Sequence, residues 1–202
     1  MLILIVVFGL ASIGFARYDY RNPPAGPTKY FAALALFACG EGVSSLAPSV
    51  GNYAALAGGV VESTTTGSPT LNQFTSAYPG LELTSSTLQL PATSAKNSHV
   101  RTYKNGETCA KGTKDAGKAG HIEIAYWPTL GSPTPTLTTD PSSVPLGTRV
   151  QISVAFIPTG VTPPRPPSSV IAAMETAIQT AATATTTTST TLGAATTTTA
   201  KT

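Results

Sequence analysis

The chain has 202 residues and a formal net charge of +3, with 10% charged and 7% aromatic residues. Soluble domains average about 25% charged residues, so the composition excludes the highly charged kind of disorder and leaves little charge for nucleic-acid binding. Together with 17 prolines, 18 glycines and many threonines, it is typical of an exported or surface protein.

The chain opens with an apolar, uncharged run at residues 2–16, which ends at Arg17. A helix that crosses about 30 Å of hydrocarbon needs about 20 residues, and the interfacial residues Tyr18 and Tyr20 bring the run close to that length. We therefore predict a transmembrane or filament-core helix at 1–20. A cleaved signal peptide remains an alternative, although no basic residue precedes the run.

A Pro-rich connector at 21–29 is followed by a second apolar stretch at 30–62, which we predict to be helical. It could be a second membrane helix at roughly 30–50 or a helix packed against a partner. Glu41 is the only charged residue within 30–61. A carboxylate inside an apolar membrane segment is usually functional, unless the chain bends there and leaves it in water.

Small residues recur in the second half of this stretch. Ala54 and Gly58 would allow a neighbouring helix to approach closely. We predict both as candidate contacts with a partner.

The two cysteines, Cys39 and Cys109, allow several interpretations. In an exported protein they could form a disulfide. Leu36 to Gly40 also resembles a lipobox, in which Cys39 would be lipidated, and a buried free cysteine is a third alternative. The sequence leaves all three open.

Residues 63–160 carry strand patterns and predict a small extracytoplasmic β domain. Apolar and polar residues alternate in 81–90, 121–127 and 148–156, which indicates strands with one covered face. Asn105-Gly106 is a strong turn signal. The sheet is predicted to be antiparallel.

Half of the basic residues gather in one short segment of this domain, residues 96–118. Only Glu107 and Asp115 oppose them there. The cluster is either a solvated loop or a patch that meets an acidic partner or lipid headgroups. Its members are Lys96, Arg101, Lys104, Lys111, Lys114 and Lys118.

After a Pro-rich spacer at 161–167, residues 168–184 predict a short helix, because Val170, Met174 and Ile178 lie four apart on one face. Met174 is a further candidate partner contact. The remaining residues, 185–202, form a Thr-rich tail without an apolar period.

No motif predicts enzymatic chemistry. Residues 112–119 approach a phosphate-binding loop, but Ala119 replaces the hydroxyl residue that magnesium requires, and a strand pattern follows instead of a helix. His121 and Glu123 share a strand face and are interpreted as surface residues rather than an acid–base pair. Trp127, at the end of the same strand, is interpreted as a packing residue or a partner contact. We predict no catalytic residue, no cofactor and no metal site.

The order of an apolar N-terminal helix, a Gly/Ala-rich stretch and a small sheet resembles type IV pilin-like proteins. The stretches AYPGLELTSSTLQL (77–90) and PLGTRVQISVAFIPTG (145–160) resemble the extracellular part of tight-adherence pseudopilins. The resemblance implies a subunit of a surface filament. The chain departs from the pilin processing pattern, since Gly14-Phe15 is followed by an aspartate, Asp19, where pilins carry a glutamate.

The sequence thus predicts an α+β fold, with one or more N-terminal apolar helices, a small antiparallel β domain and a Thr-rich tail. The predicted function is a membrane-anchored, extracytoplasmic structural subunit of a surface assembly or filament. Its partners would be the lipid bilayer and copies of itself or other membrane subunits, with no nucleic acid. The alternatives are an accessory transmembrane subunit of a respiratory or photosynthetic complex, and an exported binding module or enzyme. The candidate partner contacts are Glu41, Ala54, Gly58, Trp127 and Met174.

Overall fold

The computed structural model describes residues 28–92 and 101–191, and side chains up to residue 184. The predicted helix at 1–20, the connector up to residue 27, Lys96 and the tail beyond residue 191 lie outside the described residues. The described part is α+β, with a mixed seven-stranded sheet and a separate three-stranded sheet. Its elements are β1 (Thr28–Ala38), β2 (Glu41–Gly42), β3 (Tyr53–Leu56), β4 (Val60–Thr65), α2 (Leu71–Ala77), β5 (Glu82–Leu83), β6 (Thr87–Leu90), β7 (Arg101–Lys104), β8 (Gly120–Trp127), β9 (Thr136–Thr138), a 3-10 turn (Pro141–Ser143), β10 (Gln151–Pro158) and α3 (Ser168–Thr191).

Strand β1 organises the large sheet, whose order is β3-β4-β1-β10-β8-β9, with β2 paired to the end of β1. β1 runs parallel to β10, with Ala33 opposite Gln151 and Ala38 opposite Phe156. The other pairs in the sheet are antiparallel. The prediction of an antiparallel sheet is therefore wrong, because one parallel pair joins two strands that are more than 100 residues apart.

The prediction of an apolar helix at 30–62 is also wrong, since β1, β2, β3 and β4 occupy this stretch. β1 is buried on both faces: Phe31 and Ala33 pack toward α3, whereas Ala32 and Leu34 pack into the core on the opposite face. A strand that is covered on both sides has no polar face and reads as a continuous apolar run. Apolarity in this segment reflects burial within the domain.

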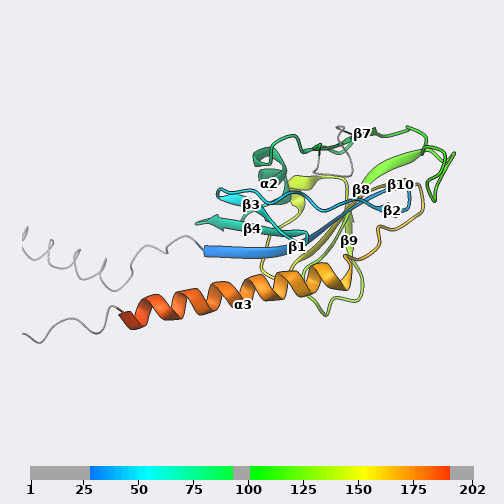
Figure 1. Ribbon diagram of the computed structural model, residues 1–202. Helices are drawn as coiled ribbons and strands as arrows, with labels where there is room; N and C mark the ends of the chain where they lie inside the picture. Colours follow the sequence, from blue (N-terminus) through cyan, green and yellow to red (C-terminus); the bar gives the residue numbers. More distant parts are fainter. Residues whose placement is uncertain (1–27, 93–100, 192–202) are drawn as a thin grey trace, which may run out of the picture.

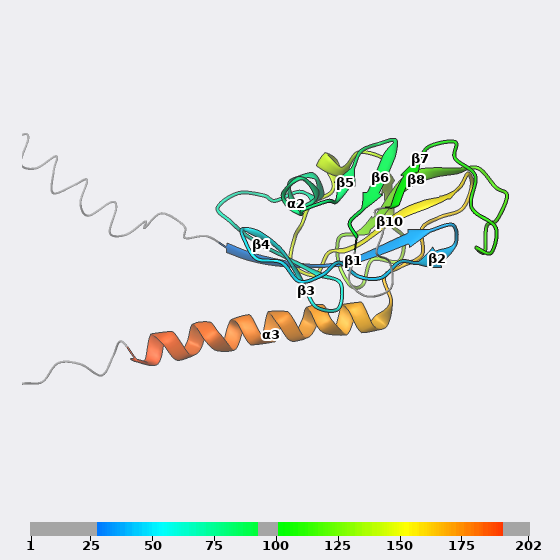
Figure 2. The ribbon, with the colours of Figure 1, turned by 45° about the horizontal axis from the view of Figure 1, so that its top comes forward.

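The domain has three layers (Figure 1). The large sheet is the middle layer, α3 lies along one face, and α2 lies with β5, β6 and β7 on the other face, as the rotated view also shows (Figure 2). The larger core fills the space between the two sheets and α2, with Phe74, Leu88, Ile124, Ile152 and Phe156 among its buried residues. A smaller cluster lies under α3, where Met174 packs with Phe31, Ala33 and Val60.

Several local predictions are confirmed. The alternating segments 121–127 and 148–156 correspond to β8 and β10, which pair with each other. The segment 81–90 contains β5 and β6, joined by a turn at its central serine pair. Asn105-Gly106 forms a turn that the Glu107 N–H closes on the Lys104 carbonyl at 3.0 Å. The strand before that turn, β7, pairs with β6.

Helix α3 covers the predicted helical range and continues into the Thr-rich region. Its C-terminal end lies at the same end of the domain as Thr28, where β1 begins, and the loop between β7 and β8 lies at the opposite end (Figures 1 and 2). Neither helix among the residues that the structure describes combines the length and the apolar character needed to cross a membrane.

Candidate functional site: an apolar cavity beside strand β1

The large sheet is interrupted along one edge of β1. Pairing with β4 ends at Ala33, and pairing with β2 begins at Phe37. Two backbone hydrogen bonds flank the interval: the Leu34 N–H donates to Gly59 at 2.8 Å, and the Leu36 carbonyl accepts from Val43 at 2.8 Å. The turn of the β3–β4 hairpin therefore ends short of β2, and a gap opens between them.

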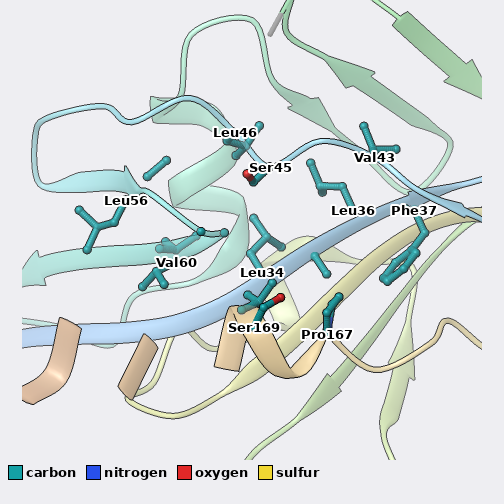
Figure 3. Close-up of a pocket in the computed structure, with 17 residues that line it drawn as sticks. Leu34, Leu36, Phe37, Val43, Ser45, Leu46, Leu56, Val60, Pro167 and Ser169 are labelled. Atoms are coloured by element: carbon teal, nitrogen blue, oxygen red, sulfur yellow. The ribbon is translucent and has the colours of Figure 1, made fainter. Parts of the chain in front are cut away.

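A cavity of about 240 Å³ occupies this gap (Figure 3). Its walls come from β1, β2, the connection from β2 to β3, the β3–β4 hairpin and the start of α3. Among the residues that the structure describes, none with an ionisable side chain lines it. The lining residues are Leu34, Ala35, Leu36, Phe37, Gly42, Val43, Ser45, Leu46, Ala55, Leu56, Gly58, Gly59, Val60, Val61, Pro167, Ser169 and Val170.

The cavity has an apolar interior and two hydroxyl groups in its outer wall. Leu34, Leu46 and Val60 are buried side chains of the wall. Ser45 and Ser169 are exposed residues, and they lie on opposite sides of the cavity, one in the β2–β3 connection and one in the first turn of α3 (Figure 3). The arrangement suits a molecule with an apolar body and a small polar group.

The tight turn at Gly58-Gly59 gives the cavity its shape. Both residues have positive φ, 79° and 80°, a conformation that side chains other than glycine rarely adopt. A Cβ at Gly58 would lie 2.9 Å from the Cβ of Ala173, and one at Gly59 would lie 2.8 Å from the Leu34 carbonyl oxygen. Because both residues are glycine, the turn can lie against α3 at Ala173 and close to the backbone of β1 at Leu34.

A second, more polar cavity of about 370 Å³ lies near the disulfide, between β2 and the loop that follows β7. Glu41, Arg101 and Glu107 contribute charged side chains to its wall. Because acidic and basic groups are mixed here, the cavity shows no preference for a ligand of one charge.

Cys39 and Cys109 form a disulfide with their Cα atoms 5.6 Å apart, and each residue is only 3% exposed. A lipidated Cys39 could not make this bond, so the structure favours the first of the three interpretations. The bond attaches the loop between β7 and β8 to the end of β1. This loop, residues 105–119, contains Lys111, Lys114 and Lys118 and is called the Lys-rich loop below. The Asp115 N–H also donates to the Cys39 carbonyl at 3.1 Å, which holds the loop at a second point.

The five candidate partner contacts occupy different places. Glu41 is exposed in β2, at a turn that brings it out of the apolar run. Ala54 is buried in β3, and Met174 is fully buried under α3 against the chain's own sheet. Gly58 is the one member that lines the apolar cavity. Trp127 ends β8 and is 4% exposed. The structure does not bring the five together in one surface.

Trp127 is covered by the segment before α3. The Arg165 guanidinium lies 5.0 Å from the centre of its ring, a cation–π contact, and also donates to the Ser132 carbonyl. The Ser153 hydroxyl donates to the Pro164 carbonyl at 2.6 Å. The Pro-rich spacer is therefore held across the face of the large sheet.

The structure places the two patterns weighed for catalysis on β8 and in the loop before it. His121 Nε2 lies 3.5 Å from Glu123 Oε2, and both side chains are partly exposed on one face of β8. Residues 112–119 form turns that lead into β8. Among the described residues, no three His, Cys, Asp or Glu side chains are placed to hold a metal ion.

Sequence reasoning missed the cavity because its walls come from segments that had been interpreted as a helix. The available signal was the Gly58-Gly59 pair, which is unfavourable inside a helix and typical of a turn.

Searches of protein-family models, curated proteins and solved structures found no match to this chain.

Proposed function

We propose that the chain is a membrane-anchored, extracytoplasmic structural subunit of a surface assembly. The observation that carries this proposal is the buried Cys39–Cys109 disulfide. Disulfides form and persist in oxidising compartments such as the periplasm, the cell surface and the extracellular space. The low charge content and the Thr/Pro-rich segments agree with such a location.

The positions of the start of β1 and the end of α3 support an anchor on one side of the domain. Residues 17–27 separate the apolar run at 2–16 from Thr28, and 11 residues can span at most about 40 Å. β1 begins, and α3 ends, at the same end of the domain (Figure 1). An apolar helix embedded in a bilayer would keep that end near the membrane and direct the disulfide-held Lys-rich loop away from it.

The assembly itself would form through the apolar segment at 2–16. Burial of apolar surface drives helix packing where water is displaced, and close contact between small residues replaces it in lipid. The partners are then copies of the same chain or other membrane subunits. A structural role does not require a catalytic group.

The test combines localisation with analysis of the native N-terminus. Expression of the full chain in its native host should give a membrane fraction that resists carbonate extraction, with a mature N-terminus before residue 17. Protease added to intact cells should degrade the domain. Material that begins beyond Ala16 and remains a monomer without detergent would contradict the proposal.

Electron microscopy of the membrane-extracted material tests the assembly. Helical or ring-shaped polymers of this chain are expected. Stable co-purification with cofactor-bearing subunits in place of such polymers would contradict the filament and favour an accessory subunit of a membrane complex.

A further inference from the structure

We propose that the apolar cavity beside β1 is a binding site for an uncharged amphiphile with an apolar body of roughly eight to ten carbon atoms. The inference is independent of the proposed assembly, because it concerns a cavity that is formed by the described domain and opens at its surface. It rests on the size, the chemistry and the construction of the cavity walls.

Size indicates the class of ligand. Protein interiors contain few voids larger than a water molecule. An engineered cavity of about 150 Å³ in another protein, lined by aliphatic and aromatic side chains, stays dry and binds benzene. The cavity beside β1 has a volume of about 240 Å³. The cavity beside β1 is therefore about 1.6 times as large as the benzene-binding cavity. Scaling the six carbon atoms of benzene by this ratio gives a ligand with eight to ten carbon atoms.

Charge excludes an ionic ligand. The wall, as far as the described part of the chain forms it, contains no Lys, Arg, His, Asp or Glu side chain. A carboxylate or ammonium group that entered the cavity would lose its hydration without gaining a partner, which is costly. The hydroxyl groups of Ser45 and Ser169 are the side-chain polar groups that the wall supplies, and they suit a hydroxyl or carbonyl on the ligand.

The cavity persists because the backbone surrounding it is fixed. The turn at Gly58-Gly59 is in contact with α3, and β1 is paired on both sides of the gap. Closing the gap would require β4 to extend past Gly59, where the chain already reverses direction. The site is therefore formed before a ligand binds.

Straight-chain primary alcohols from butan-1-ol to dodecan-1-ol are the probes. Isothermal titration calorimetry would measure their binding to the full chain in detergent micelles. The affinity should rise about fourfold for each added methylene, the factor for burying one CH₂ group, and level off near octan-1-ol or decan-1-ol, where the cavity is full. An octanoate titration should show at least tenfold weaker binding than octan-1-ol.

Gly42→Leu is the blocking variant. Gly42 lines the cavity, its φ is not in the positive region, and the nearest atom to an added Cβ is Phe37 Cε1 at 3.9 Å. A leucine there fits the backbone and fills the space, so octan-1-ol affinity should fall at least tenfold. Val50→Ala is the matched control, since Val50 is 97% exposed on the neighbouring loop and does not line the cavity.

Leu56→Ala enlarges the cavity and tests the same idea in the opposite direction. Leu56 lines the wall, and removing its side chain should move the plateau toward longer alcohols.

Circular dichroism establishes that each variant is folded. Partitioning of each alcohol and of octanoate into protein-free micelles is measured separately and subtracted, because it changes with chain length and charge, whereas it is the same for all variants with one ligand. Equal alcohol binding by wild type and Gly42→Leu, or equal binding of octanoate and octan-1-ol, would overturn the proposal.

Discussion

Removal of the disulfide is the perturbation whose effect on stability the structure determines most directly. Cys39 and Cys109 are 70 residues apart in sequence. Closing a loop of that length removes conformational entropy from the unfolded chain, which corresponds to about 4 kcal/mol at 25 °C. The variant Cys39→Ala/Cys109→Ala should lose this amount from its free energy of unfolding. Alanine retains the Cβ, so the positive φ of 54° at residue 39 is equally strained before and after the change.

Urea denaturation followed by circular dichroism would measure the loss, with thermal unfolding as a second measurement. The midpoint temperature should fall by about 8–16 °C, since each kcal/mol corresponds to about 2–4 °C for a chain of this size. Wild-type protein unfolded in urea in the presence of a reductant is the control, and its free energy of unfolding should be close to that of the double variant measured in the same buffer. A loss below about 1 kcal/mol would refute the loop-closure reasoning.

Three further predictions test the packing under α3, the glycine turn and a buried tyrosine. Met174→Ala should lower the free energy of unfolding by about 2–5 kcal/mol because it empties a fully buried site. Gln179→Ala, on the exposed side of the same helix, should change it by less than about 0.5 kcal/mol. Equal effects of the two variants in urea denaturation would contradict the packing of α3. Gly58→Ala should cost more than about 1 kcal/mol because of its positive φ and the close approach of α3, while Gly67→Ala, where no atom lies within 4 Å of an added Cβ, should be tolerated. Burial raises the pKa of Tyr78, whose hydroxyl donates a hydrogen bond to the Ala47 carbonyl, so the folded state retains a proton that the unfolded state loses, and stability should fall as pH rises above about 10. Tyr78→Phe should make that fall smaller between pH 8 and pH 11 in urea titrations, and an unchanged fall would show that other groups cause it.

Local sequence patterns determined the elements whose residues alternate in polarity or recur at helical spacing. β8 was predictable because Ile122 and Ile124 alternate with the more polar His121 and Glu123. β10 was predictable because Ile152 and Val154 alternate with Gln151 and Ser153, although the fold buries all eight of its residues. The start of α3 was predictable from the proline spacer before it and from the apolar spacing around Met174. In each case the period of two or near four residues is a property of the segment alone.

Tertiary structure decided the rest. β1 has no period because α3 covers one face and the main core covers the other, so its apolar run could not be distinguished from a helix by composition. The pairing of Cys39 with Cys109 depends on a distance of 5.6 Å between two Cα atoms that are far apart in the sequence. The cavity depends on where the β3–β4 hairpin turns relative to β2. These features are long-range because each requires separate segments to meet, and no single segment carries that information.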